Sequence, residues 1–148
     1  MCPPDDLNAE ARRHAERFQR VREAHQTELA EDYVELIAHL IEETGEARVV
    51  DLAGWLGVTN ATVNNTIQRL QRDGLVTTKP YRSIFLTDAG RELAEQSRKR
   101  HDIVREFLIA LGVDSQTADI DAEGIEHHVS SATLKAFAKF VNKARRST

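Results

Sequence analysis

The stretch ARVVDLAGWLGVTNATVNNTIQRLQRDGLV, residues 47–76, decides the fold. Its apolar residues recur at the spacing that places them on one face of a helix, first over about eight residues and then again after a break. Gly57 and Val58 form the break as a tight turn, and Thr59 or Asn60 is suited to cap the second helix. Two short helices joined by a glycine-containing turn are typical of a helix-turn-helix.

Two β-prone runs come directly after this stretch, LVTTK at 75–79 and SIFLT at 83–87. Pro80, Tyr81 and Arg82 separate them, so the pattern predicts a hairpin with a basic tip. A hairpin that follows a helix-turn-helix is a wing. The expected fold class is therefore mainly α with a small β-wing, a winged helix-turn-helix domain joined to a helical dimerisation domain.

Helices are also predicted on both sides of the winged helix. An amphipathic pattern starts at Thr27 and ends at Gly45, whereas residues 5–26 carry only a thin apolar stripe. That earlier segment is expected to be a helix that needs a partner surface, or an extension that is partly disordered. Downstream, Asp88 is the expected N-cap of a long helix that runs to about Leu111.

Two further helices are expected near the end of the chain, at about 116–128 and at about 131–143, the second capped by Ser130. The helical patterns divide the chain into an N-terminal extension (1–26), a winged-helix region (27–95) and a helical C-terminal region (96–148). The motifs described below predict that the second is a DNA-binding domain and the third a metal-binding and dimerisation domain. Apolar residues of the last part are expected to form a two-fold interface: Phe107, Leu111, Leu134, Phe137 and Phe140.

The composition narrows the class of protein. The 148 residues are 41% hydrophobic and 30% charged with seven glycines, which indicates an ordered, helix-rich chain. No apolar run approaches the roughly 20 residues that span a bilayer, and the acidic start lacks the features of a signal peptide. We therefore expect a cytoplasmic protein with no membrane partner. Cys2 is the single cysteine, so a metal site within one chain must use oxygen and imidazole ligands.

The net charge of −4 argues weakly against a nucleic-acid-binding protein, because phosphates are neutralised by Lys and Arg. The distribution of charge matters more than the sum. Residues 60–83 contain four basic residues and one acidic residue, a local balance of +3. This segment can face phosphates although acidic residues dominate elsewhere.

The second helix of the helix-turn-helix carries the side chains expected to read DNA. Its N-terminal residues would lie on base edges in the major groove, where amides and hydroxyls can bond bases. Basic residues farther along, and those of the wing, are expected to contact the sugar-phosphate backbone or the minor groove. The alternative is a protein-interaction winged helix with solvated asparagines. The candidate DNA-binding residues are Asn60, Thr62, Asn64, Asn65, Gln68, Arg69, Arg72, Lys79 and Arg82.

Three separate segments carry ligands suited to a metal ion. One pair is three residues apart on a helix, a second group has i, i+3, i+4 spacing, and a histidine lies on the long helix between them. Four carboxylates and two imidazoles in one place would repel strongly without a cation. Each piece alone also fits a solvated surface, and the histidine could contact phosphate. The candidates are Asp32 and Glu35, then Glu123, Glu126 and His127, and His101.

The stretches EDYVELI, RVVDLA, NATV, FLTDAG, RHDIVREFL and DAEGIEHHVS together resemble the diphtheria toxin repressor superfamily, and most closely its manganese-responsive branch, the MntR regulators. The likeness runs from Glu31 to Val141, about three quarters of the chain. It implies that the six candidates are metal ligands, with Glu35, Glu123 and Glu126 shared between two ions. It leaves His128 as a supporting residue. His14 and His25, in the extension, are expected on the surface.

The resemblance further implies a repressor of manganese uptake genes whose homodimer binds palindromic double-stranded DNA operators when Mn²⁺ is present, with no small-molecule substrate. Asp32 and the lack of sulfur ligands favour Mn²⁺ over Fe²⁺. An iron-responsive repressor of the same architecture is the first rival interpretation. A dinuclear carboxylate enzyme and a metal-independent winged-helix regulator are the others, although the paired Glu-x-x-His motifs of such enzymes are missing.

Overall fold

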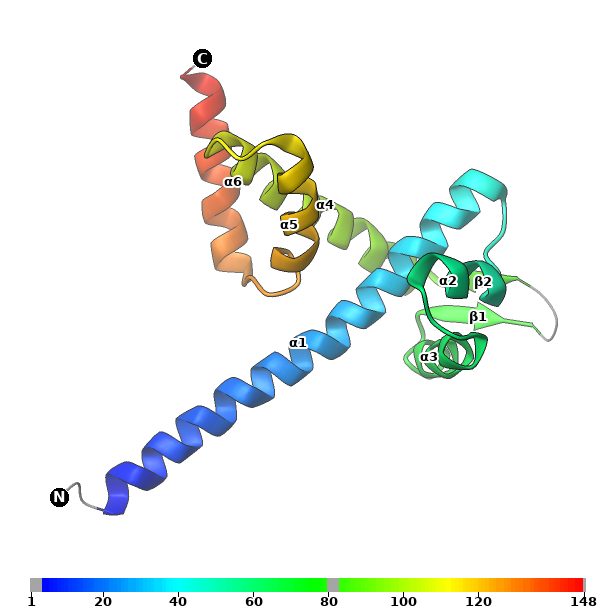
Figure 1. Cartoon of the computed structure of the whole chain (residues 1–148), viewed down its shortest axis with the longest axis horizontal. Coiled ribbons are helices and arrows are strands. Elements are labelled where there is room, and N and C mark those ends of the chain that lie inside the picture. Colours follow the sequence, from blue (N-terminus) through cyan, green and yellow to red (C-terminus); the bar gives the residue numbers. More distant parts are fainter. Residues whose placement is uncertain (1–3, 80–82, 148) are drawn as a thin grey trace.

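The structure is a computed structural model that describes residues 4–79 and 83–147. The described part is mostly helical with one antiparallel hairpin, which confirms the expected fold class. Figure 1 shows the hairpin and two short helices gathered around one half of a long helix, with the remaining helices in a separate group. In chain order the elements are α1 (Pro4–Thr44), α2 (Val49–Leu56), α3 (Asn60–Arg72), β1 (Val76–Thr78), β2 (Ile84–Leu86), α4 (Asp88–Ala110), α5 (Ser115–Ile125) and α6 (Ser131–Arg146).

The first helix, α1, is 41 residues long and has two different halves. Its C-terminal half buries Val34, Ile37 and Leu40 in the core of the winged helix. Its N-terminal half extends away from the rest of the molecule (Figure 1), and there Leu7 and Phe18 are 63% and 62% exposed. Residues 5–26 were expected to be either a helix or a partly disordered extension. In the structure they are helical and continuous with the amphipathic helix that follows them.

The turn between α2 and α3 is built as the sequence indicates. Gly57 ends α2 with a φ of +67°, a left-handed conformation that glycine adopts without steric cost, and its N–H donates to the Ala53 carbonyl. Thr59 is the N-cap of α3, because its hydroxyl accepts a hydrogen bond from the Thr62 N–H at 3.1 Å. The buried face of α3, with Val63, Ile67 and Leu70, packs into the same core as α1.

The hairpin pairs Val76 with Leu86 and Thr78 with Ile84. The Ile84 N–H also donates to the Ala47 carbonyl at 2.8 Å, which ties the hairpin to the segment between α1 and α2. Each strand is three residues long, shorter than the runs 75–79 and 83–87. The expected wing tip, Pro80 to Arg82, lies outside the described residues.

The start of α4 corrects the expected N-cap. Thr87, one residue before Asp88, accepts the capping hydrogen bond from the Gly90 N–H at 3.1 Å, while the Asp88 carboxylate pairs with Arg91. Gly90 is required here because a Cβ at this position would lie 2.1 Å from the Leu75 carbonyl oxygen. The helix is thereby packed directly against the end of the winged helix.

The C-terminal group consists of α4, α5 and α6 packed together. The Phe107 ring stacks on Phe137 with centroids 3.9 Å apart and meets Phe140 edge-on at 5.5 Å. Ser130 caps α6 as expected, whereas α5 ends at Ile125 rather than at His128. Leu111 and Phe140, both expected in a dimer interface, are 57% and 43% exposed in the single chain.

Both α1 and α4 run across the boundaries that the sequence suggested between domains, near residues 26 and 95. The three-domain division stays a prediction. Among the described residues, no helix combines the length and the hydrophobicity that crossing a membrane requires.

Candidate metal centre and DNA-binding surface

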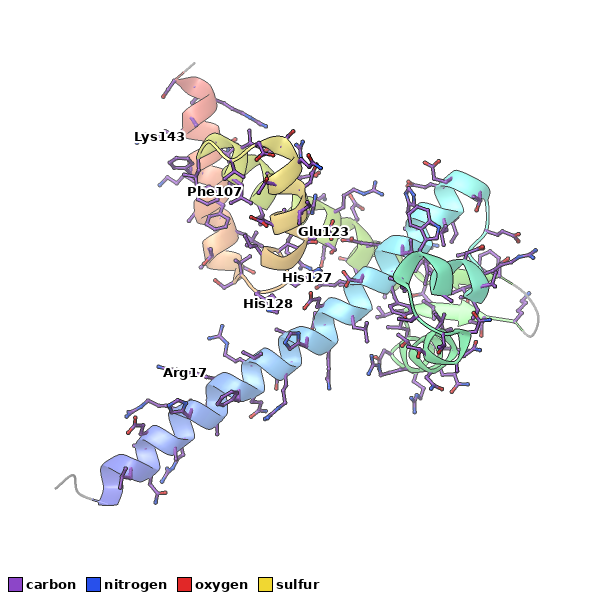
Figure 2. The ribbon with its side chains drawn as sticks, viewed as in Figure 1. Arg17, Phe107, Glu123, His127, His128 and Lys143 are labelled. Carbon is purple, nitrogen blue, oxygen red and sulfur yellow. The ribbon has the colours of Figure 1, made fainter. Side chains whose placement is uncertain are left out.

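The six candidate metal ligands come from α1, α4 and the end of α5, which meet at the C-terminal half of α1. Asp32 and Glu35 lie on α1, His101 lies on α4, and the others lie at the end of α5. Figure 2 shows Glu123 and His127 between the C-terminal group and α1. The packing of α4 against both α1 and α5 brings these segments together.

A chain of short distances links five of the ligands. The His127 Nε2 atom lies 3.2 Å from Asp32 Oδ1 and 3.5 Å from Glu126 Oε1. The His101 Nδ1 atom lies 3.2 Å from Glu123 Oε1 and 4.0 Å from the same Glu126 oxygen. Glu126 therefore stands between the two histidines.

Glu35 lines the same cavity as His101 and Glu123, so it belongs to this cluster. Burial raises the pKa of Glu35, and the neighbouring carboxylates of Glu123 and Asp32 raise it further. The Glu126 side chain is 0% exposed; its burial and then the Glu35 charge raise its pKa to about 8. The structure thus brings all six residues into one group, called here the six-residue cluster.

His127 is held in place by a residue that the sequence reasoning missed. Its Nδ1 atom hydrogen bonds to Glu31 Oε2 at 2.5 Å, and Arg100 pairs with the other oxygen of Glu31. Burial alone would lower the pKa of His127, but the neighbouring carboxylates of Asp32 and Glu31 raise it to about 10. Burial would raise the pKa of Glu31, but its hydrogen bonds with His127 and Arg100 hold this pKa below the usual value.

The positions of Glu31 and Arg100 in the sequence, each close to a candidate ligand, could have indicated their role. Glu31 precedes Glu35 by four residues, which places both on one face of α1, and Arg100 is adjacent to His101. Metal-ligating histidines commonly bond a carboxylate through the other ring nitrogen, which fixes the orientation of the ring. Glu31 has this position relative to His127.

The cluster has the donors that a divalent cation needs. Within the described residues, five buried polar atoms of the cluster make no hydrogen bond: Glu35 Oε1, both oxygens of Glu126, His101 Nδ1 and His127 Nε2. Buried polar atoms without partners are costly unless a ligand satisfies them. Carboxylate and imidazole donors without a thiolate suit Mn²⁺ and Fe²⁺. The residues therefore fit a metal ion of this kind.

The candidate base-reading residues of α3 share the face opposite its buried side. Asn60, Thr62, Asn64, Asn65 and Gln68 are all exposed, whereas Val63, Thr66, Ile67 and Leu70 face the core. Because buried and exposed positions alternate with the helical period, one complete polar face of α3 is free to contact another molecule.

The candidate phosphate contacts lie farther along the same surface. Arg72 and Lys79 are exposed, and Arg69 is half-buried in the last turn of α3. Arg82, the remaining candidate, lies outside the described residues.

Each half of the chain matches a model of a known protein domain. Residues 25–84 match the model "Iron dependent repressor, N-terminal DNA binding domain". Residues 87–148 match "Iron dependent repressor, metal binding and dimerisation domain". The chain belongs to the iron-dependent repressor family. The expected resemblance to the diphtheria toxin repressor superfamily is thereby confirmed, and the two matches lie where the structure places the winged helix and the six-residue cluster.

Relatives of known role point to one branch of this family. The chain is 54% identical to the transcriptional regulator MntR of Escherichia coli O6:H1 over 130 residues, which cover 88% of this chain and 84% of the relative. It is 41% identical to the HTH-type transcriptional regulator MntR of Bacillus subtilis over 100 residues, 68% of this chain and 70% of that one. These relatives are regulators, so the chain is a regulator and not the dinuclear enzyme considered above.

Solved structures show the same fold. A manganese-dependent transcriptional repressor in complex with manganese is 29% identical with a TM-score of 0.69, covering 76% of this chain and 52% of that one. The manganese regulator SloR is 26% identical with a TM-score of 0.66, covering 76% and 53%. The chain spans about half the length of these solved structures.

Proposed function

We propose that this protein is a manganese-dependent transcriptional repressor whose homodimer binds palindromic DNA operators and represses manganese uptake genes. The observation that carries the proposal is the six-residue cluster, which joins α1, α4 and α5 through buried donors that have no hydrogen bonds. The names of the relatives and the manganese complex of a solved neighbour support Mn²⁺ as the metal.

The ligand roles follow from position. Asp32 and Glu35 bind from α1, while His101, Glu123, Glu126 and His127 bind from the C-terminal group. A bound divalent cation would supply the positive charge that offsets the repulsion of the four carboxylates. Glu31 and Arg100 orient the His127 ring from behind. Six ligand residues provide enough donors for two ions per subunit, with Glu35, Glu123 and Glu126 shared.

The cluster connects the winged helix to the rest of the chain. The C-terminal half of α1 is part of the winged-helix core, so ligands on α1 fix the position of α3 relative to α4 and α5. A symmetric dimer formed through the Phe107–Phe137–Phe140 region would then hold two copies of α3 at a fixed separation. Half-sites on DNA lie about 34 Å apart, or at a multiple of that distance.

Metal binding and DNA binding are therefore coupled. Ligands that order the same arrangement help each other reciprocally, with a coupling of about 1–3 kcal/mol, or ~5- to 150-fold in affinity. Such a coupling is sufficient for a concentration sensor. The relatives are bacterial transcriptional regulators, which supports the cytoplasm as the location that we propose.

Fluorescence anisotropy with a labelled manganese-transporter promoter fragment tests the proposal. Wild-type protein should bind the fragment about 5- to 150-fold more tightly with Mn²⁺ than without it. Glu35→Gln should lose this difference, while Glu43→Gln, an exposed change on the same helix, should keep it. Metal-dependent binding that survives in Glu35→Gln would contradict the assignment of the cluster. Activation by Fe²⁺ and not by Mn²⁺ would favour the iron-responsive rival.

A further inference from the structure

A second group of potential ligands lies beside the six-residue cluster, again between α1 and the end of α5. Glu28 Oε2 is 3.4 Å from His25 Nδ1 and 3.2 Å from His128 Nε2. The two imidazole rings meet edge-on with centroids 5.5 Å apart. Figure 2 shows His128 next to His127, on the side of the C-terminal group that faces α1.

Two of the three distances between these ligand atoms are close to those of a tetrahedral cation site. Zinc binds imidazole nitrogen and carboxylate oxygen at about 2.0–2.2 Å, so neighbouring ligand atoms around one ion lie about 3.3–3.5 Å apart. Two sides of the triangle, 3.4 and 3.2 Å, are close to this value. The third side, between the histidines, is at most 4.8 Å, and rotation of the exposed His25 ring can shorten it.

We propose that His25, Glu28 and His128 form an accessory site for a divalent cation of the zinc class, separate from the six-residue cluster. Two imidazoles and one carboxylate leave one position for water, a donor set that zinc uses in proteins. The six-residue cluster has four carboxylates and two imidazoles, which favours harder cations. The two sites therefore differ in their metal preference.

The accessory site is open to solution, and its two histidines are not ligands of the six-residue cluster. The His25 and His128 side chains are 65% and 41% exposed, and Glu28 is 27% exposed. Glu28 also lies within 4.8 Å of ligand atoms of Asp32 and His127, so the two sites are neighbours. Neither His25 nor His128 belongs to the six-residue cluster. His25 lies on the surface, as expected from the sequence, and the proposal adds a ligand role to it.

A cation at the accessory site would act on the long helix. His25 precedes Asp32 by seven residues, about two helical turns. Ligation by His25 and His128 would extend the attachment of α1 to the C-terminal group by these two turns, toward the exposed N-terminal half. Zinc would thus restrain a part of α1 that the six-residue cluster does not reach.

The direct test is the zinc content of the full-length protein, measured by equilibrium dialysis followed by elemental analysis. Wild type should bind one more Zn²⁺ per chain than His25→Gln or His25→Gln/His128→Gln. In His25→Gln the affinity for this additional ion should fall about tenfold or more, because loss of even a supporting residue costs 10- to 100-fold. His14→Gln is the matched control, an exposed histidine on the same helix, and should bind as much zinc as wild type.

A further pair of variants separates this site from the proposed function. Glu35→Gln and Glu35→Gln/His25→Gln should again differ by one zinc although both lack the manganese response. His25→Gln should retain manganese-activated DNA binding. Equal zinc content in wild type, His25→Gln and His25→Gln/His128→Gln would overturn the accessory site, provided that circular dichroism shows all three proteins to be folded. A wild-type protein that shows the zinc difference but no manganese response would overturn the proposed function alone.

Discussion

Replacing Glu126 with glutamine should change how the stability of the metal-free protein depends on pH. The Glu126 side chain is fully buried, its two oxygens make no hydrogen bond among the described residues, and its pKa is raised to about 8. A carboxyl group whose pKa is higher in the folded state stabilises the fold at low pH. This contribution is lost as the pH rises from the unfolded value, near 4.5, through 8.

The size of the effect follows from the two pKa values. One pKa unit corresponds to about 1.4 kcal/mol. Between pH 5 and pH 8 the Glu126 carboxyl should therefore cost metal-free wild type on the order of 3 kcal/mol of unfolding free energy. Glutamine has nearly the same shape and no charge, so this loss should be missing in Glu126→Gln.

The assay is urea denaturation of the metal-free proteins, followed by circular dichroism, at several pH values from 5 to 8. The matched control is Glu123→Gln, since Glu123 belongs to the same cluster but its side chain is 57% exposed. The control should follow wild type much more closely than Glu126→Gln does. Parallel pH profiles for wild type and Glu126→Gln would refute the assignment of a buried, uncompensated carboxyl group at this position.

Three further predictions follow from other parts of the structure. Manganese binding at pH 7 should release protons, because Glu126 and His127 have pKa values raised to about 8 and 10 and must lose their protons to act as ligands. Calorimetry of Mn²⁺ binding in buffers of different ionisation enthalpy should therefore give different heats. Equal heats in all buffers would contradict this prediction. Gly90→Ala should destabilise the fold by ~1–3 kcal/mol in urea denaturation because its Cβ would meet the Leu75 carbonyl, whereas Gly54→Ala, with no atom within 4 Å, should not. Arg72→Gln should weaken binding to operator and random DNA equally, and it should lower the slope of log affinity against log salt concentration by about one. Asn64→Ala should weaken operator binding by ~1–3 kcal/mol and leave binding to random DNA unchanged. Anisotropy at several salt concentrations separates the two effects.

The winged helix could be predicted from the sequence because its signals are local. The turn glycine at 57, the cap at Thr59 and the periodic apolar residues of α3 act within a few residues of one another. The cap of α4 was misplaced by one residue because Thr87 and Asp88 both have the side chains that caps use. The close approach of Gly90 to the Leu75 carbonyl oxygen is a tertiary contact and is not visible in local spacing.

The candidate ligands were found through their type, their spacing and the family resemblance, but their supports were not. Glu31 and His127 are 96 residues apart in the chain, so no local pattern connects them. Arg100 is half-buried and pairs with Glu31, 69 residues before it in the chain, which local spacing does not reveal either. The accessory site was missed for the same reason, because His25 and His128 meet only when α1 packs beside the end of α5.

The claim that metal and DNA are coupled through the six-residue cluster is tested most directly by titrating Mn²⁺ into the free protein and into its complex with operator DNA. Linkage requires that DNA raise the affinity for Mn²⁺ by the same factor by which Mn²⁺ raises the affinity for DNA. We predict a ratio of about 5- to 150-fold in both directions. The same Mn²⁺ affinity with and without operator DNA would contradict the account.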